Sequence, residues 1–212
     1  MSKYNKILEN YNFNTGDLLL FDHKDNCTSC CECLFTIFTD SIKCCTKSKW
    51  SHSAIIIKDP QWRPDLKGLF VLQSSYENFP DSEDNELKLG VELVKMEELF
   101  KNYNGKIFCR FITCDRNKDF YNNLIKAHSV VHNRSYDINP YDWFRAAYKI
   151  YKGPNHRLKT FWCSALVSYI YVQLGIFSKE TPWTLISPED LSSNSDYPKF
   201  NNCKISNEVN IK

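Results

Sequence analysis

The sequence predicts an α+β protein in which an antiparallel sheet or small barrel packs against a layer of helices. Short apolar runs bounded by Gly, Pro, Asp and Asn fill the chain up to residue 113, and helical spacing of apolar residues begins at Arg116. Because strands come first and helices second, both halves are expected to form layers around one core. A length of 212 residues favours a single domain spanning 1–212, with its core at about 15–192.

The first half is expected to form strands. Thr15-Gly16-Asp17 turns into the apolar run Leu18–Phe21, which is short and bounded by glycine as a buried strand should be. Short links between successive strands favour antiparallel pairing. The further expected elements are the strands His52–Ile57, Gly68–Ser74, Gly90–Val94 and Lys106–Thr113, and a short helix at Met96–Tyr103.

A cysteine-rich segment from about 22 to 49 interrupts the strand pattern and has the character of an insertion. It contains Cys27, Cys30, Cys31, Cys33, Cys44 and Cys45 around an apolar patch at 34–38. Three interpretations stay open: a zinc site, for which an adjacent cysteine pair is a poor second half; a peripheral membrane contact through residues 27–45, with S-acylated thiols; and a surface loop with reduced thiols.

The second half is expected to be helical. Phe120, Leu124, Ala127 and Val131 recur on one stripe, and Gly175 supplies a stop signal after the last apolar run. The tail from Ser187 is rich in Ser, Asn and Asp. The further expected helices are Pro140–Tyr151 and Thr160–Leu174.

Cys163 is the candidate nucleophile. Helical spacing puts it in the first turn, on the same face as Leu166, Val167, Ile170 and Leu174. There the helix dipole and unpaired backbone N–H groups favour the thiolate, which predicts a lowered pKa, and the same N–H groups suit an oxyanion hole. The alternative is a buried cysteine that packs as a small hydrophobe.

His52 is the candidate general base. It opens an expected strand and shares a face with Ala54 and Ile56. A base held on a strand beside a helix-borne thiol suits acyl transfer, whereas a lone histidine is otherwise a satisfied core or rim residue. Gln73 on the neighbouring strand is the expected third residue: its amide can fix the tautomer of the ring without carrying charge, or it simply ends the strand.

Five ordered segments resemble the circularly permuted NlpC-type papain-like hydrolases, which include permuted bacterial amidases and poxvirus and giant-virus proteins. The segments are 16–21, Trp50-Ser51-His52 to Ile57, 71–74, Tyr136-Asp137 with Phe144, and 161–175, followed by a closing segment at 186–191. In this branch the His strand precedes the Cys helix, as it does here.

The resemblance implies a papain-like fold and a cysteine hydrolase that cleaves an amide, peptide or thioester bond. It gives Cys163 as nucleophile, His52 as general base and Gln73 as third residue, a position where many relatives carry a carboxylate. Trp50, Ser51, Tyr136 and Asp137 are expected at the substrate pocket, and neither a metal nor a cofactor is expected. The alternatives are an acyltransferase or thioesterase of the lecithin:retinol type, acting on acyl lipids, and a binding or virion structural module.

Charge and hydropathy exclude other classes. A formal charge of +2, from 27 basic and 25 acidic side chains, leaves no concentrated basic face for nucleic acid. The polar start and the lack of any long apolar run predict a soluble cytoplasmic protein, which for a viral protein means the host cytoplasm or the virion.

Overall fold

The computed structural model describes residues 8–23, 49–75, 79–137 and 158–212. Within these, one eight-stranded mixed sheet runs in the order β10-β5-β1-β2-β3-β4-β7-β8, and β6 and β9 form a separate pair. The strands are β1 Leu18–His23, β2 His52–Lys58, β3 Leu69–Ser75, β4 Gly90–Lys95, β5 Gly105–Arg110, β6 Ile112–Thr113, β7 Ser135–Tyr136, β8 Thr160–Phe161, β9 Lys204–Ile205 and β10 Val209–Asn210. The helices are α3 Met96–Asn102, α4 Lys118–Val131 and α6 Cys163–Gln173, with 3-10 turns η1 Trp183–Leu185 and η2 Glu189–Leu191.

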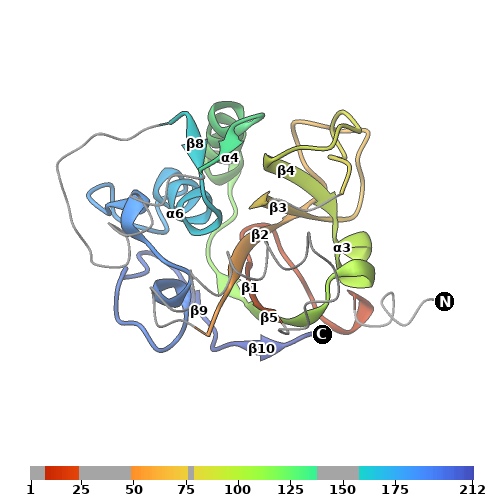
Figure 1. Cartoon of the computed structure of the whole chain (residues 1–212). Coiled ribbons are helices and arrows are strands. Elements are labelled where there is room, and N and C mark those ends of the chain that lie inside the picture. The colour runs from red at the N-terminus through yellow and green to blue at the C-terminus, as the bar shows by residue number, and fades with distance from the viewer. Residues whose placement is uncertain (1–7, 24–48, 76–78, 138–157) are drawn as a thin grey trace.

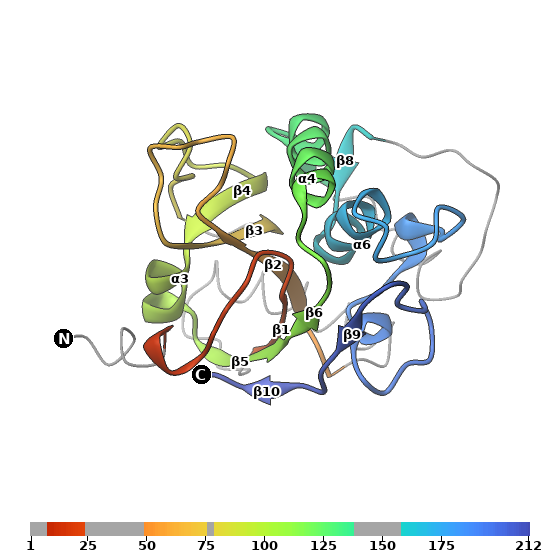
Figure 2. The ribbon, with the colours of Figure 1, turned by 180° about the vertical axis from the view of Figure 1, so that it is seen from behind.

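The α+β class is confirmed, and four of the five expected strands form as single strands. The fifth, Lys106–Thr113, is divided into β5 and β6, which belong to different sheets. The sheet is antiparallel from β10 to β7, but β7 and β8 pair in parallel, so the expectation of a purely antiparallel sheet is corrected at this edge. Figure 2 shows β10 lying along β5 at the other edge, near the C-terminus. The expected helix Pro140–Tyr151 and residues 24–48 of the cysteine-rich segment, with their zinc and membrane interpretations, lie outside the described residues.

The sheet separates two apolar clusters. Figure 1 shows α4 and α6 on one side of the sheet and α3 on the other. Strand alternation supplies both sides: in β2, Ile55 and Ile57 point toward α6, whereas Ala54 and Ile56 point toward α3. The α3 side of the sheet therefore also receives the side chain of His52, which shares the phase of Ala54.

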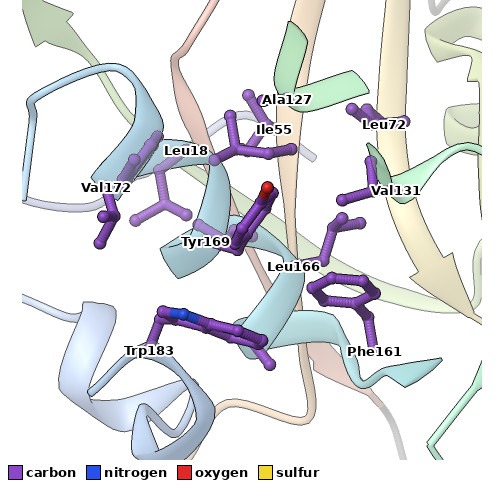
Figure 3. Packing of buried hydrophobic residues seen from close by; sticks show 14 of the residues in the cluster. Leu18, Ile55, Leu72, Ala127, Val131, Phe161, Leu166, Tyr169, Val172 and Trp183 are labelled. Atoms are coloured by element: carbon purple, nitrogen blue, oxygen red, sulfur yellow. The ribbon is translucent and has the colours of Figure 1, made fainter. Parts of the chain in front are cut away.

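Helix α6 lies between the sheet and α4. Figure 3 shows Leu166 and Tyr169 of this helix among Ile55 of β2 and Ala127 and Val131 of α4. Every residue from Cys163 to Val172 is buried, so α6 is buried on all sides and not on one face only, as its spacing suggested.

The ends of α6 follow partly from the sequence. Gly175 adopts φ 72°, and Ile176 donates its N–H to the carbonyl of Tyr171, as a left-handed helix stop requires. The expected start at Thr160 is wrong: Thr160–Phe161 form β8, since their backbone pairs with β7. The helix begins at Cys163, which therefore holds the first-turn position predicted for it.

Among the described residues, no helix has both the length and the apolar character needed to cross a membrane.

Gly90 leaves no room for a side chain where β4 pairs with β7. A Cβ there would lie 2.2 Å from the carbonyl oxygen of Arg134, and Gly90 has φ 152°. We expect Gly90→Ala to destabilise the fold by about 3 kcal/mol, because neither backbone can yield without breaking the β4–β7 pair. For a chain of this size that lowers the melting temperature by roughly 6–12 °C. Thermal denaturation followed by circular dichroism measures this change.

Gly68→Ala is the matched control. Gly68 also has positive φ, at 102°, but no atom lies within 4 Å of its added Cβ. We therefore expect Gly68→Ala to lose only the stability that left-handed backbone costs a residue with a side chain, roughly 1 kcal/mol. Equal losses in the two variants would contradict the steric explanation for Gly90.

Candidate active site

His52 lies at the start of β2, where its ring contacts β1 and β3. Phe21, its partner in the β1 register, packs against the imidazole with ring centroids 4.9 Å apart. On the other side, His52 Nε2 lies 3.0 Å from Gln73 Oε1. The sequence prediction that Gln73 contacts the imidazole is thus met by the geometry.

Behind Gln73 stands a carboxylate, Glu92, in the next strand. Gln73 and Glu92 are direct partners in the β3–β4 register, and Gln73 Nε2 donates to Glu92 Oε1 at 2.9 Å. Ser75 Oγ donates to the same carboxylate oxygen at 2.7 Å. Glu92 is only 1% exposed, so a chain of buried polar groups runs from the imidazole through an amide to a carboxylate.

This chain fixes the orientation of each group in it. An ionised carboxylate only accepts hydrogen bonds, so Gln73 must turn its NH₂ toward Glu92 and its oxygen toward His52. The ring nitrogen that faces this oxygen must carry a proton. His52 is therefore protonated at Nε2, and Nδ1 keeps the lone pair that a general base needs.

Burial sets the charge of this network. It lowers the pKa of His52 to about 4, although the hydrogen bond to Gln73 opposes the shift. Burial also raises the pKa of Glu92 to about 7, against hydrogen bonds from Ser75 and Gln73 that favour the carboxylate. Near neutral pH the imidazole is neutral, and Glu92 changes charge in the physiological range.

Cys163 is buried, at 3% exposure, on the α6 side of the sheet. Three backbone N–H groups act on its sulfur, those of Ser53, Ser164 and Cys163 itself, and each favours the thiolate. Two of them come from the first turn of α6, as the sequence predicted; the third comes from β2, directly after His52.

The predicted lowering of the Cys163 pKa is wrong. Burial outweighs the three N–H groups and raises the pKa of the thiol above its ordinary value. The helix terminus favours the thiolate, but the buried surroundings of α6 keep water away from the sulfur and have the larger effect. The resting protein thus holds a neutral thiol and a neutral imidazole.

The two halves of the site meet at Ser53. His52 points to the α3 side of the sheet, whereas Ser53 points to the α6 side and contacts the sulfur. Among the contacts of these described residues, the imidazole is hydrogen-bonded to Gln73, and no hydrogen bond joins it to the thiol. Because the two side chains lie on opposite sides of β2, transfer of the thiol proton to the ring requires one of them to move when substrate binds.

The four expected pocket residues divide into two pairs. Trp50 packs edge-on against Phe108, and Ser51 bonds the carbonyl of Phe21 through both its N–H and its hydroxyl, at 2.9 and 3.1 Å. The contacts of this pair fix the start of β2, and their contact with substrate stays a prediction.

Tyr136 and Asp137 lie nearer the thiol. The Tyr136 hydroxyl bonds the Cys163 side chain, and burial together with the charge of that sulfur raises the pKa of the tyrosine. Asp137 donates its backbone N–H to Phe161 O at 3.2 Å and adds negative charge near the hydroxyl. Tyr136 therefore belongs to the surroundings of the candidate nucleophile.

Glu92 is the site residue that the sequence interpretation missed. The signal was present: one acidic residue in the middle of an apolar strand, on the face of Val94. A buried carboxylate needs partners, so its position already indicated a polar neighbour across the sheet.

Comparisons with known proteins give a fold relationship. No family model matches the sequence. No curated protein matches it either. Among solved structures, the chain is similar to the crystal structure of metalloprotein yiiX from Escherichia coli O157:H7, DUF1105, with a TM-score of 0.53 and 12% identity over 94% of this chain and 99% of that one. At this identity the likeness concerns the fold alone, and it accords with the α+β arrangement over nearly the whole chain.

Proposed function

We propose that the chain has a permuted papain-like fold and is a cysteine hydrolase that forms an acyl-enzyme on Cys163. One observation carries the proposal most: the Gln73–Glu92 pair fixes the tautomer of His52, leaving a basic Nδ1 beside the strand residue that contacts the nucleophile. A structural histidine does not need a buried carboxylate two groups away.

The reaction follows from these groups. His52 Nδ1 takes the thiol proton as the Cys163 sulfur attacks the carbonyl carbon of an amide, peptide or thioester. The imidazolium then gives this proton to the leaving nitrogen or sulfur, and the carbon–leaving group bond breaks. Water attacks the acyl-enzyme, His52 accepts its proton, and the sulfur leaves and takes the proton back. Backbone N–H groups at the start of α6 are suited to hold the oxyanion.

An amide third residue fits this chemistry. The Cys-His-Asn arrangement of papain-like proteases uses a neutral amide in the same role. Gln73 resembles that arrangement, and Glu92 supplies the negative charge that many permuted relatives carry at the position of Gln73. Replacement of the carboxylate there is therefore no argument against turnover.

A binding module is the second candidate. It is favoured by the neutral state of the Cys163 thiol and the His52 imidazole, which are not hydrogen-bonded to each other. A thiol with a raised pKa and a histidine with a pKa near 4 make an unreactive apo site. The two candidates differ in what a carbonyl substrate does: a hydrolase is acylated and turns over, whereas a binding module is not.

Acylation of Cys163 by model acyl donors tests the proposal. The protein is incubated with a thioester and with an activated amide, and the acylated residue is located by mass spectrometry. We expect Cys163 to be acylated at least tenfold faster than Cys203, a partly exposed free thiol whose pKa burial raises to about 11. Cys163→Ala should abolish turnover, and Cys203→Ala should not change it.

The products separate the enzymatic alternatives. Release of free acid indicates a hydrolase, and transfer to an added lipid alcohol or amine indicates an acyltransferase of the lecithin:retinol type. Acylation of Cys163 no faster than that of Cys203, without product, would refute both and favour the binding module.

A further inference from the structure

A second cluster of reactive side chains lies apart from the proposed dyad. Glu83, in the connection between β3 and β4, contacts two histidines at the end of α4. Its Oε2 lies 3.0 Å from His128 Nε2 and 3.5 Å from His132 Nδ1, and the three atoms lie within 4.8 Å of one another. We propose that Glu83, His128 and His132 bind a divalent transition metal, Zn²⁺ in preference, that ties this connection to α4.

The donor set is that of zinc. Two imidazole nitrogens and one carboxylate oxygen are common zinc ligands, and tetrahedral bonds of about 2.0–2.1 Å put neighbouring ligand atoms roughly 3.3 Å apart. The observed separations of 3.0 and 3.5 Å bracket that value. Magnesium and calcium prefer sets made only of oxygen, so they fit less well.

The helix supplies the geometry of the histidine pair. His128 and His132 are four residues apart, hence on one face, and the backbone N–H of His132 still bonds the carbonyl of His128 at 2.8 Å. His128 has a buried side chain, at 7% exposure, whereas that of His132 is 36% exposed. The fourth metal position therefore opens toward solvent on the side of His132.

Surrounding groups hold the carboxylate and one imidazole in place. Trp62 Nε1 donates to Glu83 Oε1 at 2.8 Å, which leaves Oε2 to face the histidines. The Trp62 ring also stacks on His128, with centroids 4.0 Å apart. Asp81 Oδ1 accepts the backbone N–H of Glu83 at 2.9 Å. Such outer contacts orient the ligands of bound metals.

The basic side chains near the cluster are paired with carboxylates: Arg63, which also bonds the Glu83 carbonyl, pairs with Asp65 at 2.7 Å. Asp84 adds negative charge near His132, while the nearby Lys88 is already paired with Asp81 and Asp84 at 2.6 and 2.5 Å. Without an ion, the Glu83 carboxylate contacts the ring nitrogens of both histidines. A bound metal replaces these contacts with coordinate bonds.

The proposed ion has a structural role and takes no part in the proposed hydrolysis. It joins the connection before β4 to the end of α4, and β7 follows three residues after His132. Tyr136 of β7 contacts Cys163, so the ion fixes the segment that leads to the thiol. The sequence interpretation expected no metal; the His-x₃-His spacing was visible, but its acidic partner is 45 residues away.

Zinc titration of the full-length protein tests the inference. Metal-free wild type, His132→Ala and the neighbouring control Ser129→Ala are titrated with Zn²⁺ by calorimetry and then melted. We expect wild type and Ser129→Ala to bind one equivalent more than His132→Ala. At a free zinc concentration of about 100 times Kd, they should melt about 5–10 °C higher than their metal-free forms.

The other cysteines require a second measurement. Thiolates at 27–45 would bind zinc equally in all three proteins, and Co²⁺ distinguishes the sites because thiolate ligands give intense charge-transfer absorption that His and Glu do not. Zinc-edge X-ray absorption of wild type gives the ligands even where His132→Ala does not fold. Equal stoichiometry in wild type and a folded His132→Ala, or scattering from sulfur alone, would overturn the proposal.

Discussion

Replacing His52 by alanine should lower kcat/KM at pH 7 by at least about 10³-fold, within the range that a general base contributes. The raised pKa of Cys163 is the reason for so large an effect. A preformed thiolate would attack without a base, whereas a buried neutral thiol must lose its proton during the attack. The proposed dyad would thus need its histidine at the moment of bond formation, as serine hydrolases do.

The pH dependence checks this explanation. In His52→Ala the rate should rise about tenfold per pH unit, because hydroxide must generate the thiolate, so the difference from wild type should shrink toward alkaline pH. Added imidazole should restore part of the rate at pH 7. A loss below tenfold, or one that is the same at every pH, would contradict the role of His52 as base. Measurements of kcat/KM from pH 5 to 10 decide between these outcomes.

Local sequence patterns predicted most of the secondary structure around this site. Glycine at 16 and 175, apolar alternation in β2 and the spacing of α6 put His52 at a strand start and Cys163 at a helix start. These features depend on neighbours a few residues away. Local sequence alone is enough for them.

The features that were predicted wrongly or missed depend on residues that are distant in the sequence. The sign of the Cys163 pKa shift follows from burial of α6 between α4 and the sheet, which helix-terminus arguments do not include. The contact of Glu92 with Gln73 follows from the β3–β4 register, and the length of a connection does not determine register. Glu83 contacts His128 and His132 only because the β3–β4 connection packs against the end of α4.

Register also explains why position 73 tolerates glutamine. The β3–β4 pairing puts Glu92 directly opposite, so a carboxylate at 73 would face a second carboxylate in a buried site. One of two adjacent buried carboxylates must stay protonated. Glutamine avoids that repulsion, and its neutral amide hydrogen-bonds both Glu92 and His52.

Glu92→Gln should lower activity and raise stability, and both effects should appear as the pH rises through 7. One amide group separates the Glu92 carboxylate from the imidazole, so the two charges would lie roughly 7–8 Å apart. At an effective dielectric constant of about 20, the carboxylate then stabilises the imidazolium by roughly 2 kcal/mol. Loss of that charge lowers kcat/KM about 30-fold at pH 8. Below pH 6, Glu92 is itself neutral, so wild type and variant should converge.

The stability of the fold changes in the opposite direction. The folded-state pKa of Glu92, about 7, lies above the ordinary value of 4.5, so its contribution is full below pH 4.5 and is lost as the pH rises through 7. Ionisation of this buried group costs the fold about 3 kcal/mol. Glu92→Gln does not ionise, and its stability relative to wild type should increase by that amount between pH 4.5 and 8, measured by urea denaturation.

The double variant Gln73→Glu with Glu92→Gln separates charge from packing. It exchanges the two side chains across the same register pair, so composition and volume are kept while the carboxylate moves next to the imidazole. We expect it to recover most of the activity lost in Glu92→Gln. If the single variant lost activity only through disturbed packing, the exchange would restore nothing. If the proposed turnover requires a carboxylate that destabilises the fold above neutral pH, then Glu92 positions His52 through Gln73 and stabilises its imidazolium.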